Sequence, residues 1–164
     1  MKALLCRGMK TIATLLAAAM LVLAGPAKTS PAAVKIFWTD VTPRTIQYAN
    51  LDGSGAAIAV AGVSFPFDID IDNSTQKIYW TDPHANIIQR ANLDGSGRQV
   101  LVKGLADPFG IAVDGAGGKI YWTDSGAHQI QRANLDGSGR QVLLRGLANP
   151  FGIAVDSLGD GWGI

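Results

Sequence analysis

From about residue 35 onward, short apolar runs alternate with glycine-rich and polar turns. Between Phe109 and Gly146 the pattern predicts four strands, at 109–114, 119–124, 129–135 and 140–144. The turn at 136–139 reads Asp-Gly-Ser-Gly, and its glycines supply the positive φ that a tight hairpin needs. Because this part of the chain shows no sustained 3.6-residue apolar stripe, we expect an all-β fold.

The pattern repeats with a period of 42 residues, as the positions of Trp38, Trp80 and Trp122 show. The phenylalanines at 67, 109 and 151 keep the same step. A fixed period in this range predicts supersecondary units that bury their apolar faces against one another. Four short strands per period are typical of a β-propeller blade, whereas a β-helix, the alternative, has shorter coils. The sequence therefore predicts a propeller of four-stranded antiparallel blades.

The predicted strand at 119–124 has large side chains on both of its faces. Ile120 and Trp122 alternate with Tyr121 and Thr123, so the two pairs point to opposite sides of the sheet. A sheet with one face in water would alternate apolar and polar residues instead. We therefore expect each sheet to be covered on both sides by neighbouring sheets.

The Trp-Thr-Asp strands, each preceded by Phe or Tyr, resemble the YWTD (class B) repeat of the low-density lipoprotein receptor family. The Arg-Ala-Asn-Leu-Asp-Gly-Ser-Gly-Arg stretches at 90–98 and 132–140 resemble the same family, and the likeness covers residues 35–156. It implies a six-bladed, TolB-like propeller in which the Thr and Asp of the motif tie neighbouring blades by hydrogen bonds. The residues of this structural inter-blade motif are Trp38, Thr39, Asp40, Trp80, Thr81, Asp82, Trp122, Thr123 and Asp124.

The number of strands predicts an unfinished ring. The first unit lacks the strand that precedes the motif elsewhere, and the last contributes only that strand, at 151–156. About three blade equivalents result, which is half of a six-bladed ring. The pattern departs after about Gly159, so the tail at 157–164 favours a truncated gene product. Alternatively, two chains self-associate, each completing the other's unfinished blade, or the three blades form an open array.

The N-terminal segment predicts export. Lys2, Arg7 and Lys10 precede an apolar run from Thr11 to Ala24. This arrangement is typical of a secretory signal peptide. We expect a signal peptide at 1–24, with cleavage possible up to residue 27, and a linker at 25–34. A membrane anchor is the alternative, but the run is shorter than the roughly 20 residues that a spanning helix needs. We therefore expect a secreted or periplasmic protein.

Composition narrows the function classes. The only cysteine, Cys6, lies in the predicted signal peptide. The mature chain therefore cannot form disulfides, which favours a bacterial host for an exported protein. Without the three basic residues of that segment, 11 basic residues face 13 acidic ones. This balance offers no basic surface for nucleic acid or anionic lipid. All the acidic residues are aspartates, which suit turns and strand ends.

Few residues depart from the repeat, and these are the candidates for function. Residues 77–114 and 119–156 differ at seven positions, 83, 84, 86, 87, 102, 103 and 107. The loops at 83–86, 115–118 and 125–128 should therefore carry specificity. The candidate ligand-facing residues in them are Pro83, His84, Asn86, Ser125 and His128.

Asp68 and Asp70 alternate along the predicted strand at 67–72 and replace the Gly110 and Ala112 of the next unit. They could line a central channel, and their spacing is similar to the start of a calcium loop. The glycine and the twelfth-position acid of such a loop are missing, however. We expect no metal, no cofactor and no catalytic nucleophile–base pair.

These observations predict a non-enzymatic, exported propeller that presents loops to a protein or carbohydrate ligand. One alternative is a fragment of a six-bladed propeller enzyme of the lactonase or lyase kind, although the lack of glutamate counts against it. Another is a structural protein of the cell envelope.

Overall fold

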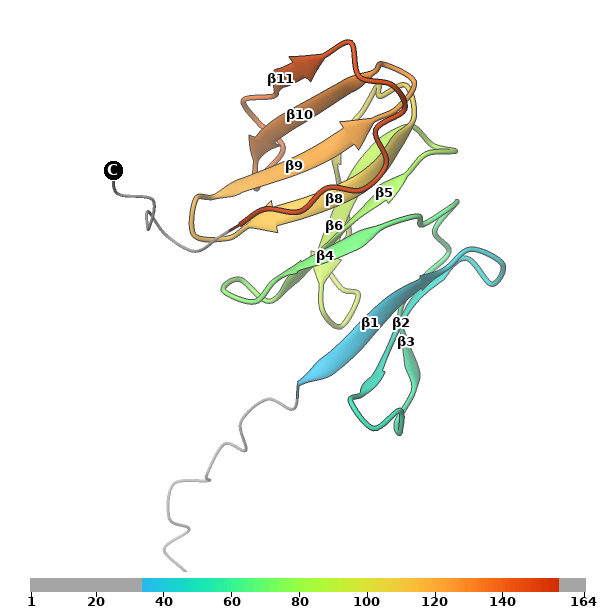
Figure 1. The fold of residues 1–164 in the computed structure, drawn as a ribbon. Helices are drawn as coiled ribbons and strands as arrows, with labels where there is room; N and C mark the ends of the chain where they lie inside the picture. The colour runs from blue at the N-terminus through green and yellow to red at the C-terminus, as the bar shows by residue number, and fades with distance from the viewer. Residues whose placement is uncertain (1–33, 157–164) are drawn as a thin grey trace, which may run out of the picture. The chain divides into compact units, whose positions relative to one another are not determined.

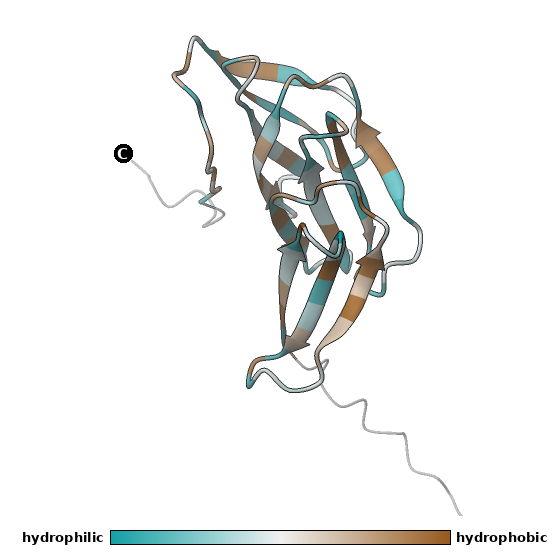
Figure 2. Cartoon of the chain, turned by 90° about the vertical axis from the view of Figure 1, so that its right-hand side faces the viewer, coloured by the Kyte–Doolittle hydropathy of each residue, from teal (hydrophilic) through white to brown (hydrophobic). Residues whose placement is uncertain are grey.

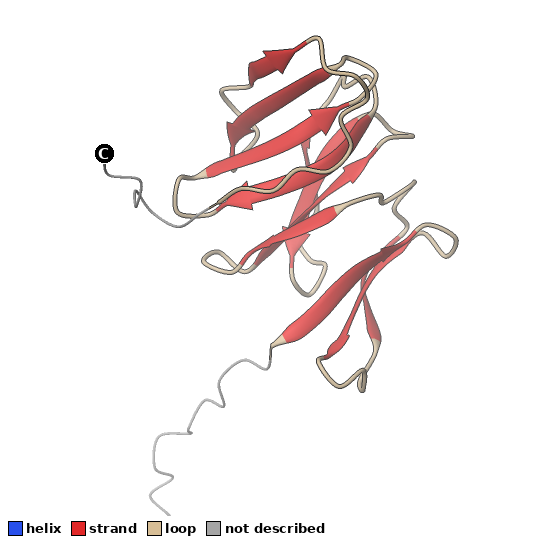
Figure 3. Cartoon of the chain, viewed as in Figure 1, coloured by secondary structure: helices blue, strands red, loops and turns tan. Residues whose placement is uncertain are grey.

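The structure, a computed structural model, describes residues 34–156 of the 164-residue chain. The predicted signal peptide, all of the predicted linker except Val34, and the out-of-pattern tail lie outside the described residues. Strands and loops make up the whole described range (Figure 3). Within it, we find no helix long and apolar enough to cross a membrane.

Eleven strands form three antiparallel sheets (Figure 1). The first sheet has the order β1-β2-β3, with β1 (Lys35–Asp40), β2 (Thr45–Asn50) and β3 (Ala57–Ala61). The second has the order β4-β5-β6-β7, with β4 (Ile69–Asp72), β5 (Lys77–Asp82), β6 (Ile87–Asn92) and β7 (Gln99–Val102). The third has the order β8-β9-β10-β11, with β8 (Pro108–Asp114), β9 (Lys119–Asp124), β10 (Gln129–Asn134) and β11 (Gln141–Arg145).

The all-β prediction and the four-stranded sheets are confirmed, and most strand bounds agree within a residue or two. The first sheet has three strands because the described chain enters it at the motif strand β1. The strand predicted at 151–156 is wrong for this structure: these residues run beside β8 but form no ladder (Figure 1). A strand forms by pairing with another strand, and no described strand pairs with residues 151–156 in a ladder.

Apolar residues from successive sheets gather in two clusters, and Figure 2 shows hydrophobic bands along the strands. Ile78 and Trp80 of β5 pack in one cluster with Ile46 of the first sheet. Tyr79, between them in sequence, packs in the other cluster with Trp122 of the third sheet. Alternate residues of one strand thus face opposite neighbours. In the second and third sheets, the Ile and Trp of the motif face the preceding sheet; in the second sheet, Tyr79 faces the following one.

Candidate functional site

The three motif threonines each reach a backbone carbonyl 28 residues further along the chain. Thr39 Oγ1 donates to the carbonyl oxygen of Phe67 at 3.0 Å. Thr81 Oγ1 donates to that of Phe109 at 2.5 Å, and Thr123 Oγ1 to that of Phe151 at 2.7 Å. In each case the carbonyl belongs to the next repeat unit, so these residues join successive units.

The motif aspartates bind the segment that enters their own sheet. Asp82 Oδ2 accepts hydrogen bonds from the backbone amides of Ser64 and Phe65, at 3.2 and 3.1 Å. Asp124 accepts in the same way from Ala106 and Asp107. Both carboxylates are buried, so these bonds satisfy groups that would otherwise be costly to leave without partners. Asp40 accepts from the Gln47 side chain at 3.4 Å.

The motif tryptophans are not equivalent. Trp80 and Trp122 are fully buried, and the guanidinium groups of Arg98 and Arg140 lie over their rings at 5.6 and 5.9 Å from the centroids. Trp38 of the first sheet is partly exposed. The tryptophans therefore serve packing between sheets.

Asp68 and Asp70 bind the neighbouring strand of the third sheet. Asp68 Oδ2 accepts from the Ile111 amide at 2.9 Å, and Asp70 Oδ2 accepts from the Val113 amide at 2.7 Å. The other oxygen of each carboxylate accepts from the amide of the next residue in β4. All four oxygens are thus engaged by backbone. Within residues 34–156, no group of three or more His, Cys, Asp or Glu side chains could hold a metal ion.

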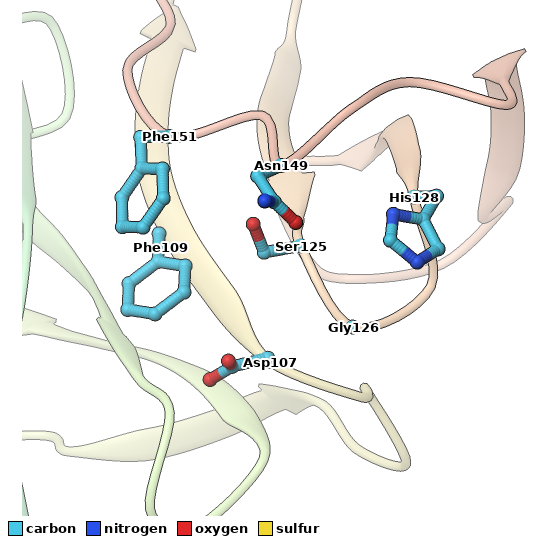
Figure 4. A pocket seen from close by; sticks show the side chains of 7 residues that line it. All are labelled: Asp107, Phe109, Ser125, Gly126, His128, Asn149 and Phe151. Carbon is cyan, nitrogen blue, oxygen red and sulfur yellow. The ribbon is translucent and has the colours of Figure 1, made fainter.

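An open hollow of about 370 Å³ lies at the loop end of the third sheet (Figure 4). The residues that line it are Asp107, Phe109, Ser125, Gly126, His128, Asn149 and Phe151. The rings of Phe109 and Phe151 stack with centroids 4.5 Å apart and form one wall. The carboxylate of Asp107, the amide of Asn149 and the imidazole of His128 supply polar groups around it (Figure 4). The hollow thus has one aromatic wall and polar groups around it.

The second sheet has aromatic rings where the third sheet has the hollow. Phe65 and His84 stack there with centroids 4.1 Å apart. One period later, the same positions hold Asp107 and Gly126, so neither ring is present. The hollow therefore lies where the third sheet lacks the two rings that stack in the second sheet.

The backbone of the 125–128 loop is held in place. His128 adopts a φ of 56°, in the left-handed region, and Leu147 donates its amide to the His128 carbonyl at 3.1 Å. Ser125 donates its amide to the Asp107 carbonyl at 2.9 Å and its hydroxyl to the Pro150 carbonyl at 3.0 Å. Non-glycine residues in this region are uncommon, although histidine is among the more tolerant.

Of the candidate residues from the sequence, the structure brings Ser125 and His128 together at the hollow. Pro83, His84 and Asn86 lie in the corresponding loop of the second sheet, between β5 and β6. Sequence reasoning missed Asp107, Asn149 and the phenylalanine wall. A signal existed, because position 107 is one of the seven that differ between the two units.

Four aspartates outside the hollow have lowered pKa values. In the three Asp-Gly-Ser-Gly turns, hydrogen bonds from the side chain and the backbone of the following serine lower the pKa of Asp52, Asp94 and Asp136. For Asp72, burial raises the pKa, but hydrogen bonds from Ser74 and Thr75 outweigh it and leave the pKa lowered. All four carboxylates therefore stay charged near neutral pH and stabilise turns.

Residues 76–114 and 118–157 match the low-density lipoprotein receptor repeat class B. These two segments contain the motif strands β5 and β9 and the hairpins that follow them. They are low-density lipoprotein receptor class B repeats. The resemblance seen in the motif is thereby confirmed, and in these repeats Thr81 and Thr123 make the same bond to the next unit.

Two solved structures are similar to this chain. A chain in the crystal structure of a nidogen/laminin complex is 30% identical, with a TM-score of 0.70, over 74% of this chain and 48% of that one. A streptogramin B lyase structure is 19% identical, with a TM-score of 0.62, over 76% of this chain and 42% of the lyase chain. The class B repeat chain thus spans about half the length of these proteins. No curated protein sequence matches it.

Proposed function

We propose that this class B repeat protein is exported and binds a protein ligand at the loop end of its sheets, without catalysing a reaction. The observation that carries the proposal is the hollow beside Phe109 and Phe151. Several residues that line it stand at positions where the near-identical repeat units differ in sequence. Loops held on a rigid scaffold are where recognition usually occurs.

The chemistry of the hollow suits a protein side chain. Stacked aromatic rings offer a large apolar surface at little cost in side-chain entropy, which is why aromatic residues are enriched in binding sites. Asp107, His128 and Asn149 add hydrogen-bonding groups of different kinds at its rim. The likeness to a chain of a nidogen/laminin complex supports a role in binding proteins. The likeness to the lyase concerns the fold alone, because the identity is 19%.

Refilling the hollow tests the proposal. The double variant Asp107→Phe/Gly126→His installs the two rings that the second sheet carries at these positions, Phe65 and His84. A matched control is Val100→Ser, which changes an exposed residue of the outer strand β7. Immobilised wild-type and variant chains would be exposed to extracellular proteins of the host and to a glycan array.

We expect the wild-type chain and the Val100→Ser control to retain the same protein, and the refilled variant to lose it. Retention of a glycan instead would assign the hollow to a carbohydrate and contradict a protein ligand. Equal retention by the refilled variant would overturn the site. Turnover of a lactone substrate by the purified chain would contradict the non-enzymatic part.

Export is tested separately. We propose that the chain is cleaved after Ala24 or at the latest after Ala27, because a positively charged start and a short apolar run precede these positions. Intact-mass measurement of the protein recovered from outside the cytoplasm should show one of these new N-termini. A chain that retains residues 1–24 would contradict cleavage.

A further inference from the structure

The first sheet leaves apolar motif residues uncovered. Ile36 is 45% exposed, whereas its equivalents Ile78 and Ile120 are fully buried. Trp38 is partly exposed, whereas Trp80 is buried. In the second sheet, the Ile and Trp of the motif pack against the first sheet. Among the described residues, the first sheet has no preceding sheet to cover the same two positions.

The third sheet leaves the complementary surface uncovered. Tyr79 of the second sheet is fully buried against the third sheet, but its equivalent Tyr121 is partly exposed. Val102 packs in the same cluster and is 5% exposed, whereas its equivalent Leu144 is 53% exposed. The surface that the second sheet buries against the third is thus presented again by the third, with nothing in the described chain against it.

Residues 151–156 already lie where the first strand of a further sheet would begin. Their sequence, Phe-Gly-Ile-Ala-Val-Asp, is identical to 109–114 in β8. The hydroxyl of Thr123 donates a hydrogen bond to the carbonyl oxygen of Phe151, as that of Thr81 does to the carbonyl oxygen of Phe109. The aromatic contact repeats as well, since Phe67 meets Phe109 at 4.7 Å and Phe109 meets Phe151 at 4.5 Å between centroids.

The strand β1 lacks the neighbour that its equivalents have. In the second sheet β4 pairs with β5, and in the third β8 pairs with β9. β1 reads Lys-Ile-Phe-Trp-Thr-Asp and β9 reads Lys-Ile-Tyr-Trp-Thr-Asp, so they differ only at Phe37. Among the described strands, β1 pairs with β2 alone. Its other edge therefore presents backbone groups that fit a strand of the β8 sequence.

We propose that a second copy of this chain fills this edge, and that the two copies do so reciprocally. Residues 151–156 of one copy pair with β1 of the other in the register of β8 and β9, where Ile111 lies opposite Trp122 and Val113 opposite Ile120. One period on, Ile153 lies opposite Trp38 and Val155 opposite Ile36 of the other copy.

The sheet faces meet in the same arrangement. Tyr121 and Leu144 of one copy cover Ile36 and Trp38 of the other, as Tyr79 and Val102 of the second sheet pack with Ile120 and Trp122. Each copy contributes three sheets, so a reciprocal pair gives six, within the range in which propellers close. A second copy is the occupant that fits both ends, because strand and edge are copies of a pair that this chain already forms.

Backbone approach in the turns agrees with this pairing. A Cβ on Gly95 would lie 1.8 Å from the carbonyl oxygen of Ala59, and one on Gly137 would lie 2.4 Å from that of Leu101. The equivalent Gly53 also has a positive φ, of 81°, yet nothing lies within 4 Å of its Cβ position. In the reciprocal pair, the carbonyl of Leu143 from the other copy takes that place.

Cross-linking between two single-cysteine chains tests the register. In full-length chains with Cys6→Ser, one variant carries Ile36→Cys and the other, of distinguishable mass, carries Val155→Cys. The two would be mixed, dissociated and reassociated, and then oxidised. We expect a disulfide-linked species containing one of each. The control mixture pairs Val155→Cys with Val100→Cys, which lies in the second sheet and should give none.

A solution measurement tests closure. Light scattering of the full chain should give twice the monomer mass, and the lysine variant Ile36→Lys should raise the dissociation constant at least about tenfold. Val100→Lys, at a residue 42% exposed in the second sheet, should leave it unchanged and controls for a lysine on an exposed apolar strand position. A monomer, an open series of higher masses, or equal cross-linking in the control mixture would overturn the proposal. None of these outcomes depends on a ligand at the hollow.

Discussion

The hydroxyl of Thr81 donates a hydrogen bond to the carbonyl oxygen of Phe109, 28 residues further along the chain, at 2.5 Å. The same hydroxyl oxygen lies 3.2 Å from the amide nitrogen of Asp68, from which it accepts. One buried side chain thus binds the residue that precedes β4 in its own sheet and a residue of β8 in the next sheet. Thr123 repeats this geometry, since it accepts from the Gly110 amide and donates to the Phe151 carbonyl. In the second and third sheets, the motif thus encodes both the sheet and its attachment to its neighbour.

Replacing Thr81 should therefore weaken the stack of sheets. Thr81→Val removes the hydroxyl and leaves the carbonyl of Phe109 and the amide of Asp68 without this partner. We expect the free energy of unfolding to fall by about 1–3 kcal/mol, the usual penalty for a buried polar group that loses its hydrogen bond. Urea denaturation followed by tryptophan fluorescence measures it.

Two further variants give this test its contrast. Thr81→Ser keeps the hydroxyl and should recover most of the loss. In the Ile36→Lys background, which leaves the edge of the first sheet uncovered, Thr39→Val removes the equivalent bond at a partly exposed position, where water can replace it, and should cost less. An equal loss in Thr39→Val and Thr81→Val would contradict the role of burial.

The carboxylates of Asp68 and Asp70 act on the strand of the next sheet. Asp70→Ala should expose the Val113 amide, which donates to Asp70 Oδ2 at 2.7 Å. We expect faster hydrogen exchange at this amide, measured by NMR, while Asp52→Ala in an exposed turn leaves it unchanged. Millimolar calcium should not shift the melting temperature, because all four carboxylate oxygens already accept from backbone amides. A calcium-dependent rise would contradict this assignment.

Much of the fold follows from local pattern. The 42-residue period places each motif strand, and alternation along 119–124 correctly assigns Ile120 and Trp122 to one neighbour. The contacts of Asp68 and Asp70 could not be predicted, because they depend on the distance between β4 and β8, which no local pattern sets. The prediction of a strand at 151–156 was wrong for a related reason. The residues have a high strand propensity, but a strand also needs another strand to pair with.

The hollow was only half predictable. Comparing the loops between units points to Ser125 and His128, since these loops differ most. The wall of Phe109 and Phe151 was not predictable, because both residues are invariant in the repeat and their position suggested packing alone. The hollow lies at positions where the second sheet carries the stacked rings of Phe65 and His84. That contact joins two separate segments, so the sequence alone does not reveal it.

Substitutions of glycine in the Asp-Gly-Ser-Gly turns should show by their loss of stability whether neighbouring sheets are in contact there. Gly95→Ala would place a Cβ 1.8 Å from the carbonyl oxygen of Ala59, so one backbone must move. We expect a loss of about 2–4 kcal/mol in the free energy of unfolding, combining the left-handed backbone and overpacking.

The matched control is Gly118→Ala. Its φ of 66° is also positive, but nothing lies within 4 Å of the added carbon. It should cost about 1 kcal/mol from the backbone alone. Its equivalent in the second sheet, Gln76, adopts a φ of 55° and shows that a side chain is accepted in this turn. Equal losses in the two variants would mean that the sheets do not meet as described.

Acid should weaken the fold through Asp72. Burial raises the pKa of Asp72, but hydrogen bonds from Ser74 and Thr75 outweigh it, so the folded pKa lies below the unfolded value of about 3.9. A group with a depressed folded pKa stabilises the fold fully above its unfolded pKa, and this contribution is lost as pH falls through the folded pKa. The contribution of Asp72 to the melting temperature should therefore be nearly constant from pH 5 to 7, and the melting temperature should fall below about pH 4.

Asp72→Asn should be less stable than wild type at pH 7, with a smaller difference near pH 3. Asp52→Asn, in an exposed turn, should change the acid dependence less. A constant difference between wild type and Asp72→Asn across this range would show that the charge of Asp72 does not contribute.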